Sequence, residues 1–354
     1  MQTDTLIIGG GLAGLFLAAR LSALGHDFLL AEARPRLGGR IATLHQDGGA
    51  FDMGPAWFWP GQPRIAQLIT QLGLSRFDQY AHGDLIYEDD QGQPIRGQGF
   101  ASMQGSYRLT GGLGQLITGL SDQIDAGRVH LGTPITGLAR HTDAITATVQ
   151  TGQTIAARRA VLAIPPRLAS DIVFDPDLPG PAHAAMKATA TWMAGHAKAV
   201  AIYDRAFWRE AGLSGDAMSR FGPLSEIHDA SPAQGGPYAL FGFLGVPPQA
   251  RADEQALKQH ILAQLTRIFG PDAASPVTLA VKDWAFDRFT ANGLDQQPLF
   301  AHPDYGLPAA LSGLWNGKLI FGGTEVAPEF GGYLEGALEA AENALSQLKS
   351  GLSD

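Results

Sequence analysis

The sequence predicts an α/β protein with a doubly wound, Rossmann-type domain and a smaller α+β domain built on a mixed sheet. Residues 5–32 have the pattern of a buried strand, a glycine-rich turn, a helix and a second strand. Residues 319–348 contain a strand, paired glycines and a long helix in the same order. Between these stretches, residues 210–250 are broken by glycines and prolines into short strands, which indicates the sheet of the second domain.

The first stretch contains a glycine fingerprint. The apolar run at residues 5–8 leads directly into Gly9-Gly10-Gly11-Leu12-Ala13-Gly14, which fits the pattern G-x-G-x-x-G. Gly9 permits the tight turn from strand to helix, and Gly11 lets the backbone approach a pyrophosphate. Gly14 lets the helix pack closely on the strand, while the free N–H groups at the start of the helix bind the anion.

An acidic residue follows the second predicted strand. Glu32 stands 18 residues after Gly14, about where an acid binds the ribose hydroxyls of a dinucleotide. A G-x-G-x-x-G match alone is weak in a chain with 45 glycines, but the order of strand, glycines, helix, strand and acid is specific. The alternative is a glycine-rich turn that binds nothing. The sequence therefore predicts a dinucleotide site with further contacts from Leu12, Ala13, Ala33 and Arg34.

Composition limits the possible partners. Apolar residues make up 45% of the 354 residues and charged residues 17%, as expected for a globular chain with a large core. The net charge of −9 argues against a nucleic acid or an anionic membrane as partner. The chain has no cysteine and its ten histidines lack ligand spacing, so we predict no metal site. No apolar run reaches about 18 residues, and the first strand leaves no room for a targeting peptide, so a cytoplasmic protein is expected.

Two further motifs follow the fingerprint. Gly38-Gly39-Arg40-Ile41 suits a loop wrapped around a phosphate, because arginine offers forked donors and glycine lets the backbone close in. A surface turn with a solvated arginine is the alternative. Asp52-Met53-Gly54-Pro55-Ala56-Trp57 has the form of a strand end that breaks into a turn. Together with the fingerprint and Glu32, these motifs resemble those of the flavin-containing amine oxidase family. The resemblance implies an FAD cofactor that is contacted by Gly39, Arg40, Gly54, Pro55, Ala56 and Trp57.

The resemblance continues in order along most of the chain. A Gly-Gly-x-Gly-Gln helix start lies at residues 111–115, and the resemblance implies an adenine contact by the backbone of Ile135. Residues 159–166 form a predicted buried strand that ends in Ile-Pro-Pro, and Trp284 matches a family tryptophan near the flavin. By resemblance, the last helix begins at the pyrimidine edge of the flavin, where its dipole stabilises the anionic reduced ring. The FAD contacts implied in this region are Gly323, Glu325 and Leu334.

Two residues are candidates for a catalytic role. Lys198 lies in an otherwise apolar run, ten residues before Trp208 of a Phe-Trp pair. This is the spacing of the family lysine that reaches the flavin through a water, and an ordinary solvated lysine near a strand end is the alternative. Tyr333 matches one half of the aromatic pair that flanks the amine in the family, whereas Leu294 falls near the other half.

The sequence also departs from the family pattern. Many members attach FAD through a cysteine thioether, but residues 290–294 contain no cysteine, so we expect FAD to be bound non-covalently. Leu294 breaks the usual aromatic pair. The span between the predicted helix at residues 64–74 and Gly111 is only about 40 residues, where family members carry a long helical insertion. The substrate domain is therefore predicted to be reduced and its site more open.

The chain is predicted to form an FAD domain from residues 1–75, 111–168 and 281–354 and a substrate domain from residues 76–110 and 169–280. The resemblance implies hydride transfer from an amine C–H to flavin N5, giving an imine that hydrolyses. Because only one dinucleotide fingerprint is present, O2 (with release of H2O2) or an unknown electron acceptor is expected to reoxidise the flavin. The alternatives are a desaturase or protoporphyrinogen-oxidase-like dehydrogenase, and a flavin-binding protein with a non-catalytic role. Lys198 favours amine oxidation.

Overall fold

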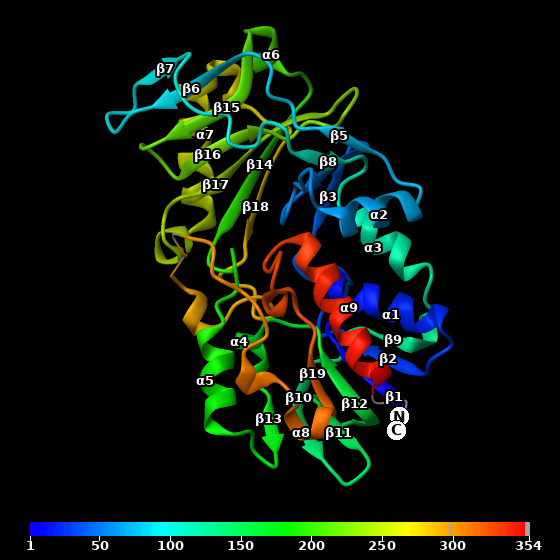
Figure 1. Cartoon of the computed structure of the whole chain (residues 1–354). Coiled ribbons are helices and arrows are strands. Elements are labelled where there is room, and N and C mark those ends of the chain that lie inside the picture. Colours follow the sequence, from blue (N-terminus) through cyan, green and yellow to red (C-terminus); the bar gives the residue numbers. More distant parts are fainter. Residues whose placement is uncertain (298, 300, 351–354) are drawn as a thin grey trace.

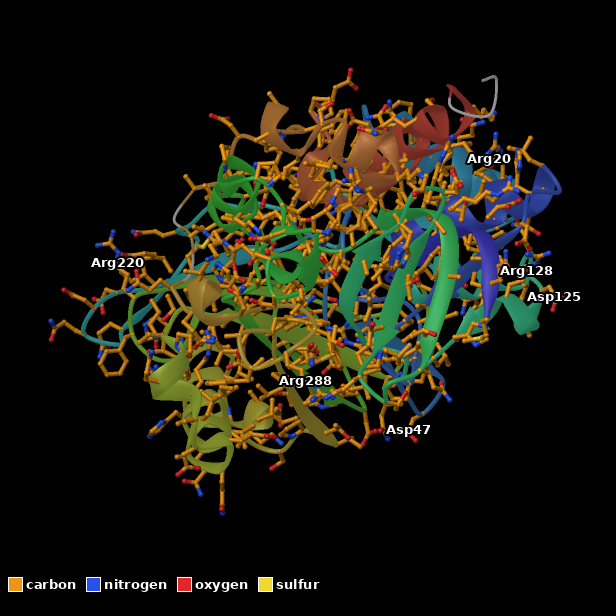
Figure 2. The ribbon with its side chains drawn as sticks, turned by 90° about the horizontal axis from the view of Figure 1, so that it is seen from below. Arg20, Asp47, Asp125, Arg128, Arg220 and Arg288 are labelled. Atoms are coloured by element: carbon orange, nitrogen blue, oxygen red, sulfur yellow. The ribbon has the colours of Figure 1, made fainter. Side chains whose placement is uncertain are left out.

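The computed structural model describes residues 1–297, 299 and 301–350, and it contains two large β-sheets. The two sheets occupy opposite ends of the view in Figure 1, and the first turn of helix α9 (Leu334–Ser350) lies near the middle. Figure 2 shows charged side chains such as Arg20, Arg128 and Arg220 pointing outward from the periphery. Within the described residues, no helix is both long enough and apolar enough to cross a membrane.

The first sheet has eight strands and includes the strand that begins the glycine fingerprint. Its order is β13-β10-β11-β12-β1-β2-β9, and β19 pairs in parallel with β12. Strand β1 lies in parallel between β12 and β2, and its continuous apolar run is typical of a strand buried on both faces. The strands are β1 (Gln2–Ile8), β2 (Phe28–Ala31), β9 (Val129–His130), β10 (Ile135–Arg140), β11 (Ile145–Val149), β12 (Thr154–Leu162), β13 (Val173–Asp175) and β19 (Leu319–Phe321).

Strand β12 corrects one detail of the sequence interpretation. The sequence predicted a buried strand at residues 159–166, but β12 begins at Thr154, ends at Leu162 and is one strand of nine residues. Its first half pairs antiparallel with β11 and its second half pairs with β19, while β1 lies along its other edge. The arginines interrupt the apolar pattern without breaking the strand, because Arg158 is exposed and lies 3.2 Å from Asp4 of β1.

Helices cover both faces of the first sheet. One buried cluster joins Ile7 and Leu30 of the sheet to α1, α2, α3 and α9. A second cluster joins Leu6 and Leu162 on the opposite face to α4, α5 and α8. The mixed α/β architecture expected from the sequence is therefore confirmed. These helices are α1 (Leu12–Ala23), α2 (Pro63–Gln71), α3 (Gly114–Ser121), α4 (Pro166–Ala169), α5 (Gly180–Ala188) and α8 (Leu314–Gly317).

The second sheet has seven strands in the order β18-β14-β17-β16-β15-β6-β7. It is mixed, as predicted, because β15 pairs in parallel with β6 whereas the other neighbours are antiparallel. Helices α6 (Phe207–Glu210) and α7 (Glu254–Phe269) share a buried cluster with one face. Val200 and Phe241, on the other face, pack against Phe51 and Trp57. The strands are β6 (Asp84–Glu88), β7 (Pro94–Arg96), β14 (Ala197–Tyr203), β15 (Leu213–Ser219), β16 (Leu224–Asp229), β17 (Tyr238–Leu244) and β18 (Thr278–Asp283).

Two small sheets complete the fold, and one predicted domain boundary needs correction. The small sheets pair β3 (Thr43–Gln46) with β4 (Gly49–Asp52) and β5 (Arg76–Asp78) with β8 (Tyr107–Leu109). The predicted start of the last FAD-domain segment, residue 281, falls inside β18. Because β18 pairs with β14 from Thr278 to Asp283, the whole strand belongs to the second sheet, and the segment is better begun after Asp283.

Candidate active site

A cavity of about 650 Å³ lies between the two sheets. One end of the cavity, here called the fingerprint end, is formed by residues that follow β1 and β2. The other end, here called the sheet end, is formed by residues of β14, β16 and β17 and by aromatic side chains from loops. The fingerprint end includes Gly9, Gly11, Leu12, Ala13, Glu32, Arg34, Gly39 and Arg40. The sheet end includes Trp59, Met103, Trp192, His196, Lys198, Glu226, Phe243 and Tyr333.

Backbone crowding explains the glycines at the fingerprint end. Gly9 has φ +111°, a conformation that favours glycine. A Cβ atom at Gly14 would lie 1.9 Å from the carbonyl oxygen of Gly9, so helix α1 packs directly on the turn. Gly39 has φ +56°, and a Cβ there would lie 3.1 Å from the Cα of Gly11. The two glycine motifs therefore approach each other with only backbone between them.

Glu32 closes the end of β2 and is almost completely buried. Its Oε2 accepts a hydrogen bond of 2.6 Å from the amide of Gly10, and its Oε1 accepts one of 2.8 Å from the amide of Arg34. The Arg34 guanidinium donates to Asp287 Oδ1 at 2.5 Å and to Thr290 Oγ1 at 2.7 Å. The acid is thus fixed against the fingerprint turn while its side chain still forms part of the cavity wall.

Arg40 and Glu325 form an ion pair beside the same end. Arg40 Nη1 lies 2.6 Å from Glu325 Oε1, and the Glu325 side chain is fully buried. Burial alone would lower the pKa of Arg40, but the charge and hydrogen bond of Glu325, with the nearby charges of Tyr305 and Asp295, together outweigh burial and raise that pKa. Glu325 Oε2 has no hydrogen-bond partner among the described residues. A buried carboxylate oxygen without a donor keeps an unused capacity to accept a hydrogen bond.

Lys198 is buried at the sheet end, so the alternative of a solvated lysine is wrong. Its Nζ donates a 3.2 Å hydrogen bond to the carbonyl oxygen of Gly54, and it lies 3.9 Å from the ring centre of Phe241 and 5.7 Å from that of Trp57. Burial lowers the pKa of Lys198 to about 7, an effect that the nearby charge of Asp52 opposes and only partly offsets. Both protonation states of the side chain are therefore accessible near neutral pH.

Aromatic side chains from loops, Trp59, Trp192 and Tyr333, also line the cavity. Tyr333 stacks on His302 with ring centres 4.8 Å apart and an interplanar angle of 9°, and it lies edge-on to Trp59 at 6.1 Å. Trp192 lies 5.0 Å from His302 in an edge-on arrangement. Leu294, which the sequence placed near the second aromatic position, is 52% exposed and is not part of the cavity wall. That placement is wrong, because Asn292 caps a 3-10 turn that directs Leu294 outward.

The cavity brings together all but four of the site residues predicted from the sequence. Those in its wall include Gly54, Pro55, Ala56, Trp57, Trp284, Gly323 and Leu334. Trp284 is fixed by a 3.1 Å hydrogen bond from its Nε1 to the carbonyl of Met53. The four outside the wall are Gly14, Ala33, Ile135 and Glu325, of which Gly14 and Glu325 support wall residues directly. Ile135 begins β10 and its adenine contact stays a prediction.

The sequence interpretation missed a buried charged cluster at the sheet end. His228 lies between two carboxylates, with Nδ1 2.6 Å from Asp216 Oδ1 and Nε2 2.8 Å from Glu226 Oε1. Glu226 is in the cavity wall and also accepts a hydrogen bond from Ser102. Residues 226 and 228 have the spacing of two side chains on one face of a strand. Which strands lie beside them depends on strand pairing and register, which a single sequence does not reveal.

Comparison with known proteins is consistent with this geometry. The family model for flavin containing amine oxidoreductases matches residues 12–95 and 94–345. A probable flavin-containing monoamine oxidase A of Dictyostelium discoideum is 22% identical over 99% of this chain and 98% of its own length. An L-amino acid dehydrogenase of Synechocystis is 24% identical over 96% of this chain and 93% of its own length. The structure of wild-type putrescine oxidase bound to putrescine has a TM-score of 0.83 at 21% identity, covering 99% of both chains.

The chain belongs to the flavin-containing amine oxidoreductase family. It is an FAD-dependent oxidoreductase of the amine oxidase type, and the family resemblance inferred from its motifs is confirmed. Because the sequence identity to putrescine oxidase is low, the likeness to that structure supports the fold alone. Among the described residues, no group of three or more histidine, aspartate or glutamate side chains is arranged to hold a metal ion.

Proposed function

We propose that this protein oxidises the C–H bond next to an amine nitrogen and releases an imine that hydrolyses. The observation that supports this most strongly is the position of Lys198. Its side chain is buried in the cavity and donates to the carbonyl of Gly54, within the motif assigned to the cofactor. The cavity thus joins a dinucleotide fingerprint at one end to a buried lysine and aromatic side chains at the other. Amine oxidation also agrees with the names of the relatives.

The residues at the fingerprint end fit FAD. Gly11 and Gly39 present backbone only, Arg40 offers a guanidinium for the pyrophosphate, and Glu32 offers a carboxylate for the ribose. The unpartnered Oε2 of Glu325 would accept a hydrogen bond in the same region. When bound, the flavin accepts the hydride, and the chain supplies binding, orientation and exclusion of water.

Lys198 is proposed to hold a water molecule at the flavin. With a pKa of about 7, its amine both donates and accepts hydrogen bonds near neutral pH. The faces of Phe241 and Trp57 limit its movement, because each ring attracts the charged form. Tyr333 and Trp59 form a wall of the cavity that would orient the amine.

We infer that FAD is bound without a covalent bond to the protein. The chain has no cysteine, and Thr290, at the start of the segment where a family cysteine would stand, is instead engaged by Arg34. Precipitation with acid should therefore release all yellow colour into the supernatant. Colour that stays with the pellet would show a covalent bond through another side chain, such as histidine or tyrosine.

We propose that the substrate domain is shorter than that of relatives at the β6–β7 hairpin. The alignment with the Dictyostelium relative extends over 457 positions, whereas this chain has 354 residues, so at least 103 positions lack a residue here. The two stretches that match the family model meet at residues 94 and 95, in β7 (Pro94–Arg96). A missing insertion at this point agrees with the short span predicted from the sequence.

The electron acceptor is proposed to be O2. Relatives differ here, since one is named an oxidase and another a dehydrogenase. Rapid mixing of the FAD-bound protein with a panel of amines under anaerobic conditions should bleach the flavin, and admission of air should restore the colour with release of H2O2. Bleaching without recovery in air would assign a dehydrogenase, and no bleaching by any amine would contradict amine oxidation and favour the desaturase-like alternative.

A further inference from the structure

The sheet end of the cavity has a row of side chains that cross three strands. Lys198 of β14 is directly opposite Phe243 of β17, which is opposite Glu226 of β16. Residues that are opposite each other in antiparallel strands point to the same face, and all three belong to the cavity wall. Neighbouring strands place opposite Cα atoms about 5 Å apart, so Lys198 and Glu226 are separated by about 10 Å across the sheet.

Glu226 is the one carboxylate among the described wall residues at the sheet end. Phe243, which is opposite it on β17, is apolar, and Met103 adds a second apolar side chain to the same cavity wall. About a quarter of the side chain is exposed, and the two protein hydrogen bonds it accepts, from His228 and Ser102, both reach Oε1. Oε2 has no protein donor within the described part of the chain, so it is available to a ligand.

His228 keeps this carboxylate charged and oriented. Burial alone would lower the pKa of His228, but its hydrogen bonds to Asp216 and Glu226 outweigh burial and raise that pKa. Burial alone would raise the pKa of Glu226, but the hydrogen bond and charge of His228 lower it. Two carboxylates flank the single imidazole, so even with His228 protonated the cluster carries a net charge of −1 and is not neutralised from within. The uncompensated charge lies beside the cavity.

We propose that Glu226, held by His228 and Asp216, binds a second cationic group of the substrate, so that the preferred substrates are α,ω-diamines or other amines with a positively charged tail. The inference rests on the proposed amine oxidation, with the oxidised nitrogen near Lys198 and Tyr333 and the tail directed along the row toward Glu226. An apolar alkyl chain between the two nitrogens would lie across Phe243. His228 acts as a positioning residue, since it contacts Glu226 and is not itself part of the cavity wall.

The test compares matched pairs of substrates that differ by one terminal amine. Alkylamines and α,ω-diaminoalkanes of four to eight carbons are assayed with the FAD-bound enzyme for the rate constant of flavin reduction and its half-saturation concentration. The wild type is expected to prefer the diamine, and Glu226→Gln is expected to reduce the ratio of diamine to monoamine kcat/KM by roughly tenfold to a hundredfold, as for loss of a charged hydrogen bond. Glu254→Gln, at an exposed ion pair on α7, is the control and should leave the ratio unchanged.

Outcomes separate this inference from the proposed function. If monoamines and diamines both reduce the flavin and Glu226→Gln leaves their ratio unchanged, amine oxidation stands and the role of Glu226 is wrong. If neither amine reduces the flavin, amine oxidation fails. Calorimetric titration of the same amines onto the FAD-bound protein then tests Glu226 without turnover. Diamine binding that is weakened by Glu226→Gln supports the inference, and equal binding to both proteins overturns it.

The role of His228 is tested by a double-mutant cycle. His228→Gln is expected to raise the half-saturation concentration of the diamine roughly threefold to tenfold with little change in the limiting rate of flavin reduction. In the Glu226→Gln background the same substitution should have no further effect, because His228 acts through that carboxylate. His260→Gln, on the exposed face of α7, is the control. An equal loss in both backgrounds, or an equal loss for monoamines, would assign His228 a purely structural role.

Discussion

The two ends of the cavity are built in different ways. At the fingerprint end, the turn itself is formed by contacts between residues that are close in sequence, such as Gly9 with Gly14 and the amide of Arg34 with Glu32, and the ion pairs of Arg34 and Arg40 with distant residues are added to it. At the sheet end, Lys198, Phe243 and Glu226 come from three strands and meet only through strand register. The first end is therefore determined by a local motif, and the second by long-range pairing.

The two ends should also respond differently to substitution. Backbone atoms are in close contact at the fingerprint end, so an added methyl group has no space to occupy. The sheet end is formed by side chains around a cavity, so a substitution there changes what is bound more than whether the chain folds.

The largest effect is expected for Gly14→Ala. The new Cβ would lie 1.9 Å from the carbonyl oxygen of Gly9, and backbone atoms cannot yield as a flexible side chain does. Overpacking commonly costs about 1–3 kcal/mol, and a contact this short with backbone belongs at the upper end of that range, so FAD binding should weaken about a hundredfold. Flavin absorbance per purified chain measures the loss. Gly180→Ala, where no atom lies within 4 Å of the new Cβ, should keep full colour. A fully yellow Gly14→Ala variant would contradict the crowding argument.

The next effect is expected for Glu32→Ala. Removal of a charge-assisted hydrogen bond to the ribose costs about 1.5–3 kcal/mol, so FAD affinity should fall roughly tenfold to a hundredfold. The amides of Gly10 and Arg34 also lose their acceptor. Titration of apoprotein with FAD gives the affinity, and Glu329→Ala at an exposed position is the control. Unchanged affinity would show that Glu32 supports the turn but does not contact the cofactor.

The sequence predicted more of the fingerprint end of the cavity than of the sheet end. Glu32 and Arg40, which were predicted to contact FAD, lie together in the cavity wall because their places depend on the spacing of glycines within about 30 residues, and their contact with FAD stays a prediction. Lys198 was found through a family spacing along one strand. The Asp216–His228–Glu226 cluster was missed, because it depends on the pairing between β15 and β16. The register is also irregular where β15 pairs with β6 and where β16 pairs with β17.

Leu294 shows that spacing along the sequence does not predict where a side chain lies in an irregular loop. Its place was inferred from spacing in a segment without regular periodicity. In the structure, the Asn292 side chain accepts a hydrogen bond from the amide of Leu294, and Arg167 donates to the carbonyl of Leu294. These contacts fix a turn that directs the side chain to solvent, and Trp192 is instead an aromatic residue of the wall. The contact with Asn292 is local, but the contact with Arg167 joins residues 127 positions apart and has no local signal in the sequence.

A smaller effect, confined to one half-reaction, is expected for Lys198→Met. Methionine keeps the length and apolar character of the side chain and removes the charge, so the protein should stay folded and yellow. Reduction of the flavin by amine should be largely intact, whereas reoxidation by O2 should slow about tenfold or more, which corresponds to about 1.4 kcal/mol per tenfold. Stopped-flow measurements separate the two steps, with exposed Lys187→Met as control. Normal rates in both steps would remove Lys198 from the mechanism.

The smallest effect concerns stability as a function of pH. Burial lowers the pKa of Lys198 to about 7 from an ordinary value of 10.5, so between these values the unfolded chain binds a proton at this site that the folded chain does not. The stability of the wild type relative to Lys198→Met should therefore rise with pH above about 7, with a slope of at most about 1.4 kcal/mol per pH unit, and should be flat well below pH 7. Urea denaturation of both FAD-bound proteins at pH 6, 7.5 and 8.5 measures the difference between their free energies of unfolding. This difference should grow by about 1 kcal/mol between pH 7.5 and pH 8.5. A difference that stays constant over this range would mean that Lys198 keeps an ordinary pKa. The ammonium would then be stabilised by neighbours such as Asp52 and the faces of Phe241 and Trp57 despite its burial, and a neutral lysine could not be part of the mechanism.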